Sequence, residues 1–402
     1  MRKRKDNKAV NKPVNKPVNK PALIIGIILL IVLMIAVRSL LTKDAKKGAR
    51  GDENLNESTV QDENVTLPET ERYDITLGFA GDICFADNYT PMQHLAALGT
   101  DDISAAISQD YIDDMRSMSL MWINNEFVYS DRGEPLPGKM YTFRSTPSHV
   151  KYLDDLGIDI VGLANNHVYD YGPDAFEDTL TTLENDGMPY VGAGHNLSEA
   201  MSPVYLKADG FTIAYVAASR AEKLKMTPQA TETEGGILRC YDNELFLQAI
   251  REARANADFV IALPHWGTEH STVLEEAQTS GAREYIEAGA DAVIGAHPHI
   301  LQGIEYVEGK PVVYSLGNFW FDDYSQDTMI AELHLTGEYE AGLPSLASGN
   351  VELRIIPGTQ IGVETRKATD PDLAKRILHD LEDISVNVSI DENGIVREND
   401  LQ

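Results

Sequence analysis

Two histidines separated by one proline follow a short apolar run in the segment DAVIGAHPHILQG, residues 291–303. The apolar run is typical of a short buried strand, so His297 and His299 lie where a strand ends. Because side chains alternate along an extended chain, we expect both imidazoles to point to the same side. Neutral imidazoles are common ligands of divalent metal ions. The pair therefore indicates either a metal site or a hydrogen-bonded polar end of a buried strand.

Polar side chains also follow five other apolar runs of strand length. In an open α/β sheet, ligands bind beyond the carboxyl ends of the strands, where neighbouring strand ends converge. We therefore expect these side chains to gather with the two histidines at one rim. The residues are Asp82 after the first run, Asn124 and Glu126 after the second, Asn166, His167 and Asp170 after the third, His265 and Glu269 after a later one, and Asn318 after the last.

The chemistry of this set favours a hard or borderline divalent metal. Carboxylates, an amide oxygen and imidazoles suit Mn²⁺, Fe or Zn²⁺ better than they suit metals that prefer thiolates. The set exceeds what one tetrahedral ion needs and fits two ions about 3.5–4 Å apart. Each residue alone also has a structural explanation, such as a helix cap at Asp82, a turn at Asn165 and Asn166, or a packed core histidine at His265. A metal-free, hydrogen-bonded rim is therefore the structural alternative.

The elements that carry these residues alternate between strand-like and helix-like patterns. Near-continuous apolar strands that alternate with helices predict an α/β architecture with a sheet covered on both faces. The strand-like runs are 73–80, 119–123, 159–164, 211–219, 258–264, 291–296 and 311–315, and the helical patterns are 146–157, 172–187, 242–257 and 275–290. Antiparallel-looking strands (329–336 and 351–357) and a helix (370–383) follow.

Charge divides the chain sharply. Residues 1–50 carry 13 Lys and Arg against two Asp, which leaves a net charge of −40 for the remainder of a chain whose total is −29. So acidic a body excludes a nucleic-acid-binding role, which needs clustered basic residues. Residues 22–37 are uncharged and apolar, and with Leu40 and Leu41 they are long enough to span a bilayer. The excess of positive charge before this run predicts a cytoplasmic N-terminus and an exported body, with a cleaved signal peptide as the alternative.

Other catalytic templates are absent from the sequence. It contains no Walker loop, no dinucleotide-binding glycine motif and no nucleophile elbow. Two cysteines exclude a disulfide scaffold, although one bridge between Cys84 and Cys240 remains open.

An ordered series of motifs resembles one known family, the CapA (PgsA-type) proteins of capsule or poly-γ-glutamate synthesis. The resemblance covers roughly residues 73–320 and rests on GFAGDI, NNE, GLANNHVYDYG, PHWGTE, GAHPHILQGIE and YSLGNFWFD. The family in turn resembles calcineurin-like metallophosphoesterases. The resemblance implies a two-sheet sandwich flanked by helices, here after an N-terminal transmembrane helix.

The resemblance also implies roles for single residues. The metal ligands would be Asp82, Glu126, Asn166, His265, His297 and His299, with His167 catalytic, Asp170 orienting it, and Asn124, Glu269 and Asn318 binding substrate or supporting the ligands. The sequence departs from the family pattern in two places. Cys84 stands where the first motif usually has a histidine, and Glu126 stands where an aspartate is usual. A site with one ion instead of two is therefore also consistent with the sequence.

The sequence thus predicts a single-pass membrane protein of capsule or poly-γ-glutamate synthesis, with a polyanionic polymer and a membrane synthase as partners. A metal-dependent phosphoesterase or amide hydrolase of another surface substrate, and a non-catalytic polyanion-binding module, are the alternatives. The predicted parts are a basic cytoplasmic tail (1–21), a transmembrane anchor (22–41), an acidic linker (42–72), the main domain (73–322), C-terminal strands and a helix that complete it (323–385), and a polar tail (386–402).

Overall fold

The computed structural model describes residues 72–221, 226–340, 343–344 and 349–400. Within these residues, no helix is long and apolar enough to cross a membrane. The transmembrane helix predicted over 22–41 lies outside the described residues, as do the tail before it and nearly all of the linker after it.

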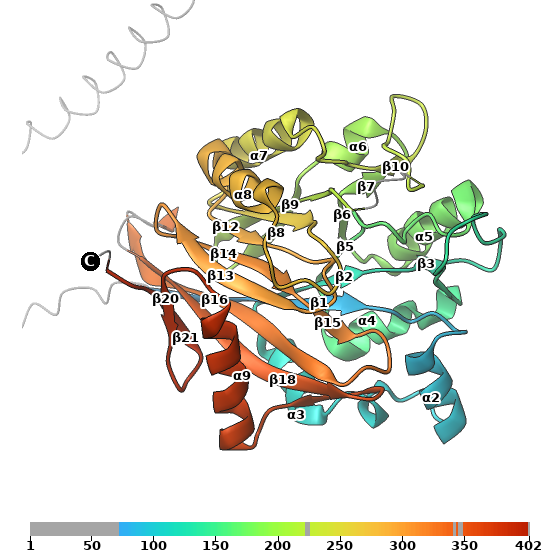
Figure 1. Cartoon of the computed structure of the whole chain (residues 1–402). Helices are drawn as coiled ribbons and strands as arrows, with labels where there is room; N and C mark the ends of the chain where they lie inside the picture. The colour runs from blue at the N-terminus through green and yellow to red at the C-terminus, as the bar shows by residue number, and fades with distance from the viewer. Residues whose placement is uncertain (1–71, 222–225, 341–342, 345–348, 401–402) are drawn as a thin grey trace, which may run out of the picture. The chain divides into compact units, whose positions relative to one another are not determined.

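The larger of two main sheets is mixed, and its long strand β1 lies next to the other sheet (Figure 1). β1 runs parallel to β2 on one side and antiparallel to β16 on the other. In pairing order the strands are β20 (Val388–Ile390), β21 (Ile395–Glu398), β18 (Asn350–Ile361), β16 (Gln326–Glu340), β1 (Arg72–Ile83), β2 (Leu120–Asn125), β5 (Ile160–Gly162) and β6 (Tyr190–Val191), with β15 (Asn318–Trp320) paired to β1, β17 (Leu343–Pro344) to β16 and β19 (Glu364–Lys367) to β18.

The second main sheet has four parallel strands between two antiparallel ones. In pairing order they are β13 (Leu301–Val307), β14 (Lys310–Leu316), β12 (Ala292–Ile294), β11 (Phe259–His265), β9 (Phe211–Ser219) and β8 (Val204–Ala208). Two short ladders join β3 (Val128–Tyr129) to β4 (Arg144–Ser145) and β7 (Ala193–Gly194) to β10 (Gly236–Ile237).

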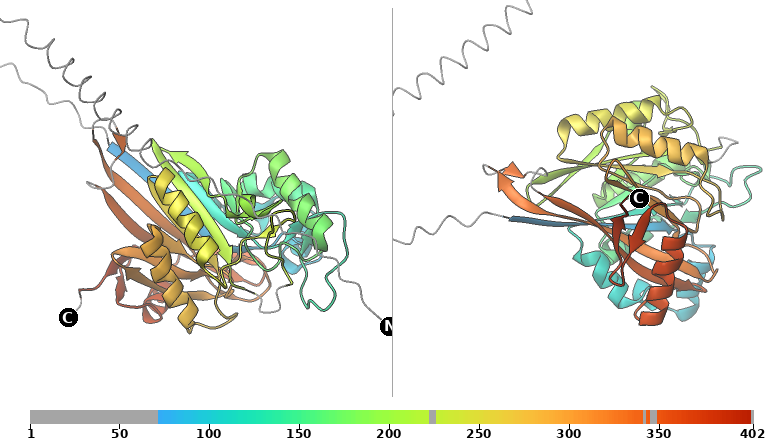
Figure 2. Two further views of the ribbon diagram at one scale, coloured as in Figure 1. Left: turned by 90° about the horizontal axis from the view of Figure 1, so that it is seen from above. Right: turned by 60° about the vertical axis from the view of Figure 1, so that its left-hand side comes forward.

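Helices cover the outer face of each sheet, and α9 lies beside β18 and β13 (Figures 1 and 2). The helices on the larger sheet are α2 (Thr90–Leu98), α3 (Gln109–Ser117), α4 (Lys151–Leu156) and α5 (Gly172–Asp186), with the short 3₁₀ turns η1 (Ile103–Ala105) and η2 (Pro147–Val150). Those on the second sheet are α6 (Leu197–Met201), α7 (Glu244–Asn256) and α8 (Glu276–Ala288), and α9 spans Pro371–Asp383.

The period-two alternation of strand side chains builds three apolar layers. On β1, Leu77 and Phe79 face the second sheet, whereas Ala80 faces the helices. Ile83 faces the helices as well, because the register of β1 shifts between Ala80 and Asp82. β11 behaves likewise, because Ile261 packs between the sheets and its neighbours pack under the helices. Each fully buried large apolar side chain contributes roughly 1.5–3 kcal/mol. The sequence prediction of an α/β fold with strands buried on both faces is confirmed.

The C-terminal end differs from the prediction. Residues 386–402 are expected to form a polar tail, yet β20 and β21 lie there and β21 pairs with β18. Val388 and Val396 are buried in the core between the sheets. Each strand is only three or four residues long, which is too short for its alternation to stand out in the sequence.

Candidate metal centre at the strand ends

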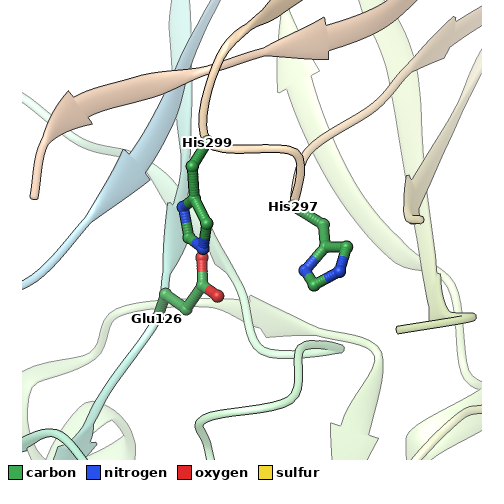
Figure 3. Close-up of side chains that lie close together, drawn as sticks. All are labelled: Glu126, His297 and His299. Carbon is green, nitrogen blue, oxygen red and sulfur yellow. The ribbon is translucent and has the colours of Figure 1, made fainter. Parts of the chain in front are cut away.

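Two groups of side chains that could hold a metal ion share Glu126. One group is Glu126, His297 and His299, and the other is Asp82, Glu126 and His265. In each group, one ligand atom per residue lies within 4.8 Å of the others. Figure 3 shows the His299 ring directed at the carboxylate of Glu126, with His297 beside it. We refer to these five residues together with Asn124 as the strand-end centre.

The strand ends of the larger sheet place both carboxylates. Asp82 is in register with Asn124 where the parallel strands β1 and β2 end, and Glu126 follows β2. A close approach of the backbone holds this end of β1, because the Asp82 N–H donates to the Gly317 carbonyl at 2.9 Å. Only glycine fits before it, since a Cβ at Gly81 would lie 1.8 Å from the Gly317 oxygen.

Asn124 connects the two carboxylates. Its Nδ2 lies 2.7 Å from Asp82 Oδ1 and 3.1 Å from Glu126 Oε2, and it also lies 3.3 Å from the Nδ1 of His265. Its Oδ1 accepts a hydrogen bond from Asn165 at 3.2 Å. One amide therefore donates to both carboxylates and fixes their separation.

The segment that carries His297 and His299 is not the extended chain that the sequence predicts. Both residues have positive φ, +102° at His297 and +60° at His299. Such values are costly for residues with a Cβ and cluster at functional sites. The tight bend, and not the alternation of an extended strand, brings both rings to Glu126. The predicted alternation does not apply, because strand β12 already ends at Ile294.

The second sheet contributes His265, the last residue of β11. Its Nε2 lies 2.8 Å from Asn166 Oδ1 and 3.6 Å from Glu126 Oε1. Its ring also packs against that of His297, with centroids 4.7 Å apart. Side chains from both sheets thus meet at Glu126.

His167 approaches the centre from the loop after β5. Its Nδ1 lies 2.7 Å from Asp170 Oδ2, and its Nε2 lies 3.9 Å from Glu126 Oε1. Lys139 lies on the other side of Asp170, with its Nζ 2.6 Å from Asp170 Oδ1. The same ammonium donates to the Asn166 carbonyl. Lys139 therefore ties the loop between β3 and β4 to the loop that carries His167.

Burial dominates the electrostatics of the centre. Asp82 and Glu126 are fully buried, and burial, followed by the charge of Asp82, raises the pKa of Glu126 well above its ordinary value. Burial, followed by the charge of His299, lowers the pKa of His297 to about 3. Burial is also the largest effect on the pKa of His299 and lowers it, but the hydrogen bond to Asp82, the charge of Asp82 and the hydrogen bond to Asn318 together outweigh burial, so the net shift is upward.

The donor set fits a divalent cation. Among the described residues, Glu126 Oε1 and His297 Nδ1 are buried and have no hydrogen-bond partner. Buried polar atoms without partners are costly, and here both belong to one group of side chains whose ligand atoms lie within 4.8 Å of one another. Two buried acidic side chains beside three buried imidazoles form an oxygen and nitrogen donor set of the kind that binds Mn²⁺, Fe or Zn²⁺.

The remaining predicted residues lie around this centre at different depths. Asn318 is buried and its Oδ1 lies 2.8 Å from the His299 Nδ1. Glu269 is exposed on the loop after β11, and its charge acts on Glu126 and His299 without a close contact. Cys84 packs in the apolar layer under the helices, where burial raises its pKa well above the ordinary value. Cys240 belongs to a different layer, and both thiols are free.

Four supporting residues were missed in the sequence. Lys139 and Phe143 lie in or beside a loop that carries no periodic pattern, and the Phe143 ring packs at a tilt against that of His167, with centroids 4.5 Å apart. Asp322 and Gln360 come from the end of the matched motifs and from β18. Only Asp322 had a signal available, because it closes the motif YSLGNFWFD.

Comparison with known proteins places these residues in a family. Residues 76–323 match the family model described as bacterial capsule synthesis protein PGA_cap. The chain is 36% identical over 199 residues to the PGA biosynthesis protein CapA of Bacillus subtilis, covering 48% of this chain and 52% of that protein. It is 32% identical over 200 residues to the capsule biosynthesis protein CapA of Bacillus anthracis, covering 46% of each. The chain thus spans about half the length of these curated relatives.

The fold of this chain can also be compared with that of a solved structure. The calcineurin-like phosphoesterase YfkN of Bacillus subtilis is 15% identical, with 78% of this chain and 99% of that chain covered and a TM-score of 0.44. Because the family model spans more than half of the residues, the chain belongs to the bacterial capsule synthesis protein (PGA_cap) family.

Proposed function

We propose that this protein is a membrane-anchored, extracytoplasmic accessory protein of capsule or poly-γ-glutamate synthesis that binds one or two divalent ions at the strand-end centre. Membership of the PGA_cap family supports the pathway. The observation that carries the metal proposal is the pair of ligand groups that share Glu126.

The residues that would hold the ions come from both sheets. Asp82, Glu126 and His265 would hold one ion, and Glu126, His297 and His299 would hold the other. Asn166, hydrogen-bonded to His265, is available to the first group. A divalent ion bound there supplies a Lewis acid for a phosphoryl or carbonyl oxygen. The chain itself excludes most water, because these side chains are buried.

A second candidate function, hydrolysis of a phosphoester or amide bond, is favoured over a purely binding role by His167. Asp170 fixes the Nδ1 side of this imidazole, so the Nε2 side faces the centre. An imidazole oriented by a carboxylate is a typical group for moving a proton to or from a reacting atom. Such an arrangement is not needed for gripping a polyanion.

The anchor and the location are part of the proposal. Residues 22–41 would cross the membrane, with residues 1–21 in the cytoplasm and the acidic body outside, where it would meet the polymer and a membrane synthase. The charge distribution of the N-terminal segment supports this orientation. Protease added to intact protoplasts should digest the body and spare the N-terminal tail. Protection of the body would contradict the orientation.

Metal content provides the direct test of the centre. The full chain, purified in detergent at neutral pH, is expected to hold one or two ions per chain by elemental analysis. Glu126→Gln should lose them, whereas Glu305→Gln, a buried glutamate hydrogen-bonded to Tyr314, should retain them. A wild-type chain without stoichiometric metal would contradict the proposal.

Activity separates the two candidate functions. His167→Ala should keep the metal and lose any turnover of phosphomonoester, phosphodiester or γ-glutamyl amide substrates. If metal loss abolishes polymer formation in cells while the wild type turns over none of these bonds, the binding role is correct and the hydrolase is not.

A further inference from the structure

A chain of buried hydrogen bonds runs from β18 to the strand-end centre. Gln360 donates to the Asp322 backbone carbonyl at 2.6 Å and lies 3.1 Å from Asp322 Oδ1. Asp322 Oδ2 accepts from Asn318 Nδ2 at 3.0 Å, and Asn318 Oδ1 lies 2.8 Å from His299 Nδ1. All four side chains are buried. Gln360 lies outside the segment matched by the family model, so the chain of bonds joins the C-terminal part of the sheet to the centre.

The directions of these bonds are determined by chemistry. Both carboxylate oxygens of Asp322 face donors, because Oδ1 also accepts from the Tyr324 N–H at 2.9 Å. A carboxylate only accepts, so Asn318 must turn its Nδ2 toward Asp322 and its Oδ1 toward His299. The Nδ1 of His299 must then carry the proton, and Asp82 Oδ2, 3.2 Å from the same nitrogen, is a second acceptor for it. The lone pair of this imidazole therefore lies on Nε2.

We propose that Asp322 is a positioning residue that acts through Asn318 to hold His299 as the Nδ1–H tautomer, with Nε2 available to an ion beside Glu126. The inference rests on the proposed function, because it assumes that the centre binds a divalent ion. Figure 3 shows the His299 ring reaching toward Glu126, which is the direction this role requires. The bond from Asn318 also supports a residue whose backbone has the costly φ of +60°.

Asparagine cannot replace Asp322 without a conflict. In Asp322→Asn, the new NH₂ group would face either the Asn318 Nδ2 or the Gln360 and Tyr324 donors. In either arrangement two N–H donors would face each other. The protein would then lose a buried hydrogen bond, or the Asn318 amide would turn over. A turned amide would present Nδ2 to His299 Nδ1, which would lose its acceptor at 2.8 Å and keep only Asp82 Oδ2 at 3.2 Å.

A reciprocal exchange restores every donor and acceptor. In the double variant Asn318→Asp with Asp322→Asn, the amide at 322 can donate to the carboxylate at 318 and still accept from Tyr324 and Gln360. The carboxylate at 318 can accept from His299 Nδ1. A role in local packing alone would not predict this rescue.

The test measures the dissociation constant of Mn²⁺ for the full chain in detergent, by titration calorimetry after metal removal. Asp322→Asn is expected to weaken Mn²⁺ binding about 10–100-fold, as removal of a group that supports a metal-binding histidine commonly does. Asp323→Asn, at the exposed neighbouring position, should leave the constant unchanged. The double variant should recover most of the loss, and circular dichroism checks that each variant is folded.

Two results would overturn the inference. One is a Mn²⁺ affinity of Asp322→Asn equal to that of the wild type, and the other is a double variant that binds Mn²⁺ as weakly as the single variant. Neither result would contradict the proposed metal centre itself. Absence of Mn²⁺ binding in the wild type would instead contradict the proposed function, and the role of Asp322 with it.

Discussion

Asn124 donates to two buried carboxylates that would otherwise repel each other. Its amide lies within hydrogen-bond distance of Asp82 and Glu126, and burial already raises the pKa of Glu126. In the absence of a cation, this amide is the main neutral group that offsets the paired acids. The stability of the metal-free protein should therefore depend on residue 124.

Two substitutions at position 124 test this dependence. Asn124→Ala removes the donor and should lower the free energy of unfolding by about 1–3 kcal/mol. Asn124→Asp also adds a third carboxylate, so with a chelator present it should lower the free energy of unfolding more than Asn124→Ala does. This decrease should become smaller when Mn²⁺ is added. Urea unfolding with and without metal measures both. Equal behaviour of the two variants under both conditions would show that charge at this position is unimportant.

Lys139 is a second residue with a large expected effect, because its ion pair with Asp170 is almost completely buried. Lys139→Met leaves Asp170 without this partner in the interior and should cost about 3–5 kcal/mol. Lys151→Met is a matched control, since Lys151 and Asp101 form a similarly short pair on the surface. Its substitution should change stability little. Comparable losses in the two variants, measured by urea unfolding, would refute the special role of burial.

At the scale of elements, the sequence predicts where the strands end and which polar residues lie there. It does not predict which loops support those residues. Asp82 and Glu126 converge because the parallel neighbours β1 and β2 end along one edge of the larger sheet, a rule that holds for open α/β sheets in general. His265 ends β11 of the second sheet, and the meeting of strand ends from two sheets does not follow from that rule. The position of His299 was also predicted, but the reason for it was wrong, because a bend with positive φ replaces the extended chain. Lys139 and Gln360 reach the site through a loop and a distant strand, for which spacing in the sequence gives no signal.

His195 links helix α5 to the short strand β7, and this link should depend on pH. Its ring nitrogens lie 2.6 Å from Glu177 and 3.2 Å from Glu184, both on α5. Burial lowers the pKa of His195, but the hydrogen bonds to Glu184 and Glu177 and the charges of the two glutamates together raise this pKa above its ordinary value. A raised pKa in the folded state means that the protonated form stabilises the fold. This contribution is complete below about pH 6.5 and is lost as the pH rises through the folded-state pKa.

The variant His195→Asn should therefore be less stable than the wild type at pH 5.5, and the difference should shrink at pH 9. Urea unfolding at the two pH values measures it. His379→Asn, at an exposed position on α9, serves as the control for the substitution itself. A difference that grew with rising pH would have the wrong sign for this link.

For the molecule as a whole, the segment matched by the family model does not contain the complete sheet. β16 lies between β1 and β18, and both β16 and β18 follow residue 323. The same C-terminal region supplies Gln360, which holds Asp322. The family motifs thus supply the centre, and the C-terminal strands complete the sheet that holds it.

Removal of residues 386–402 tests this dependence. The truncation deletes β20 and β21 and so exposes one edge of β18. It also removes Val388 and Val396 from the core, each of which contributes roughly 1.5–3 kcal/mol. We expect a lower urea midpoint than for a chain that lacks only residues 401–402. Because β18 carries Gln360, Mn²⁺ binding should weaken as well. An unchanged midpoint would mean that these residues behave as the polar tail that their composition suggests. A lower midpoint with unchanged Mn²⁺ affinity would mean that β18 holds Gln360 in place without its outer neighbours.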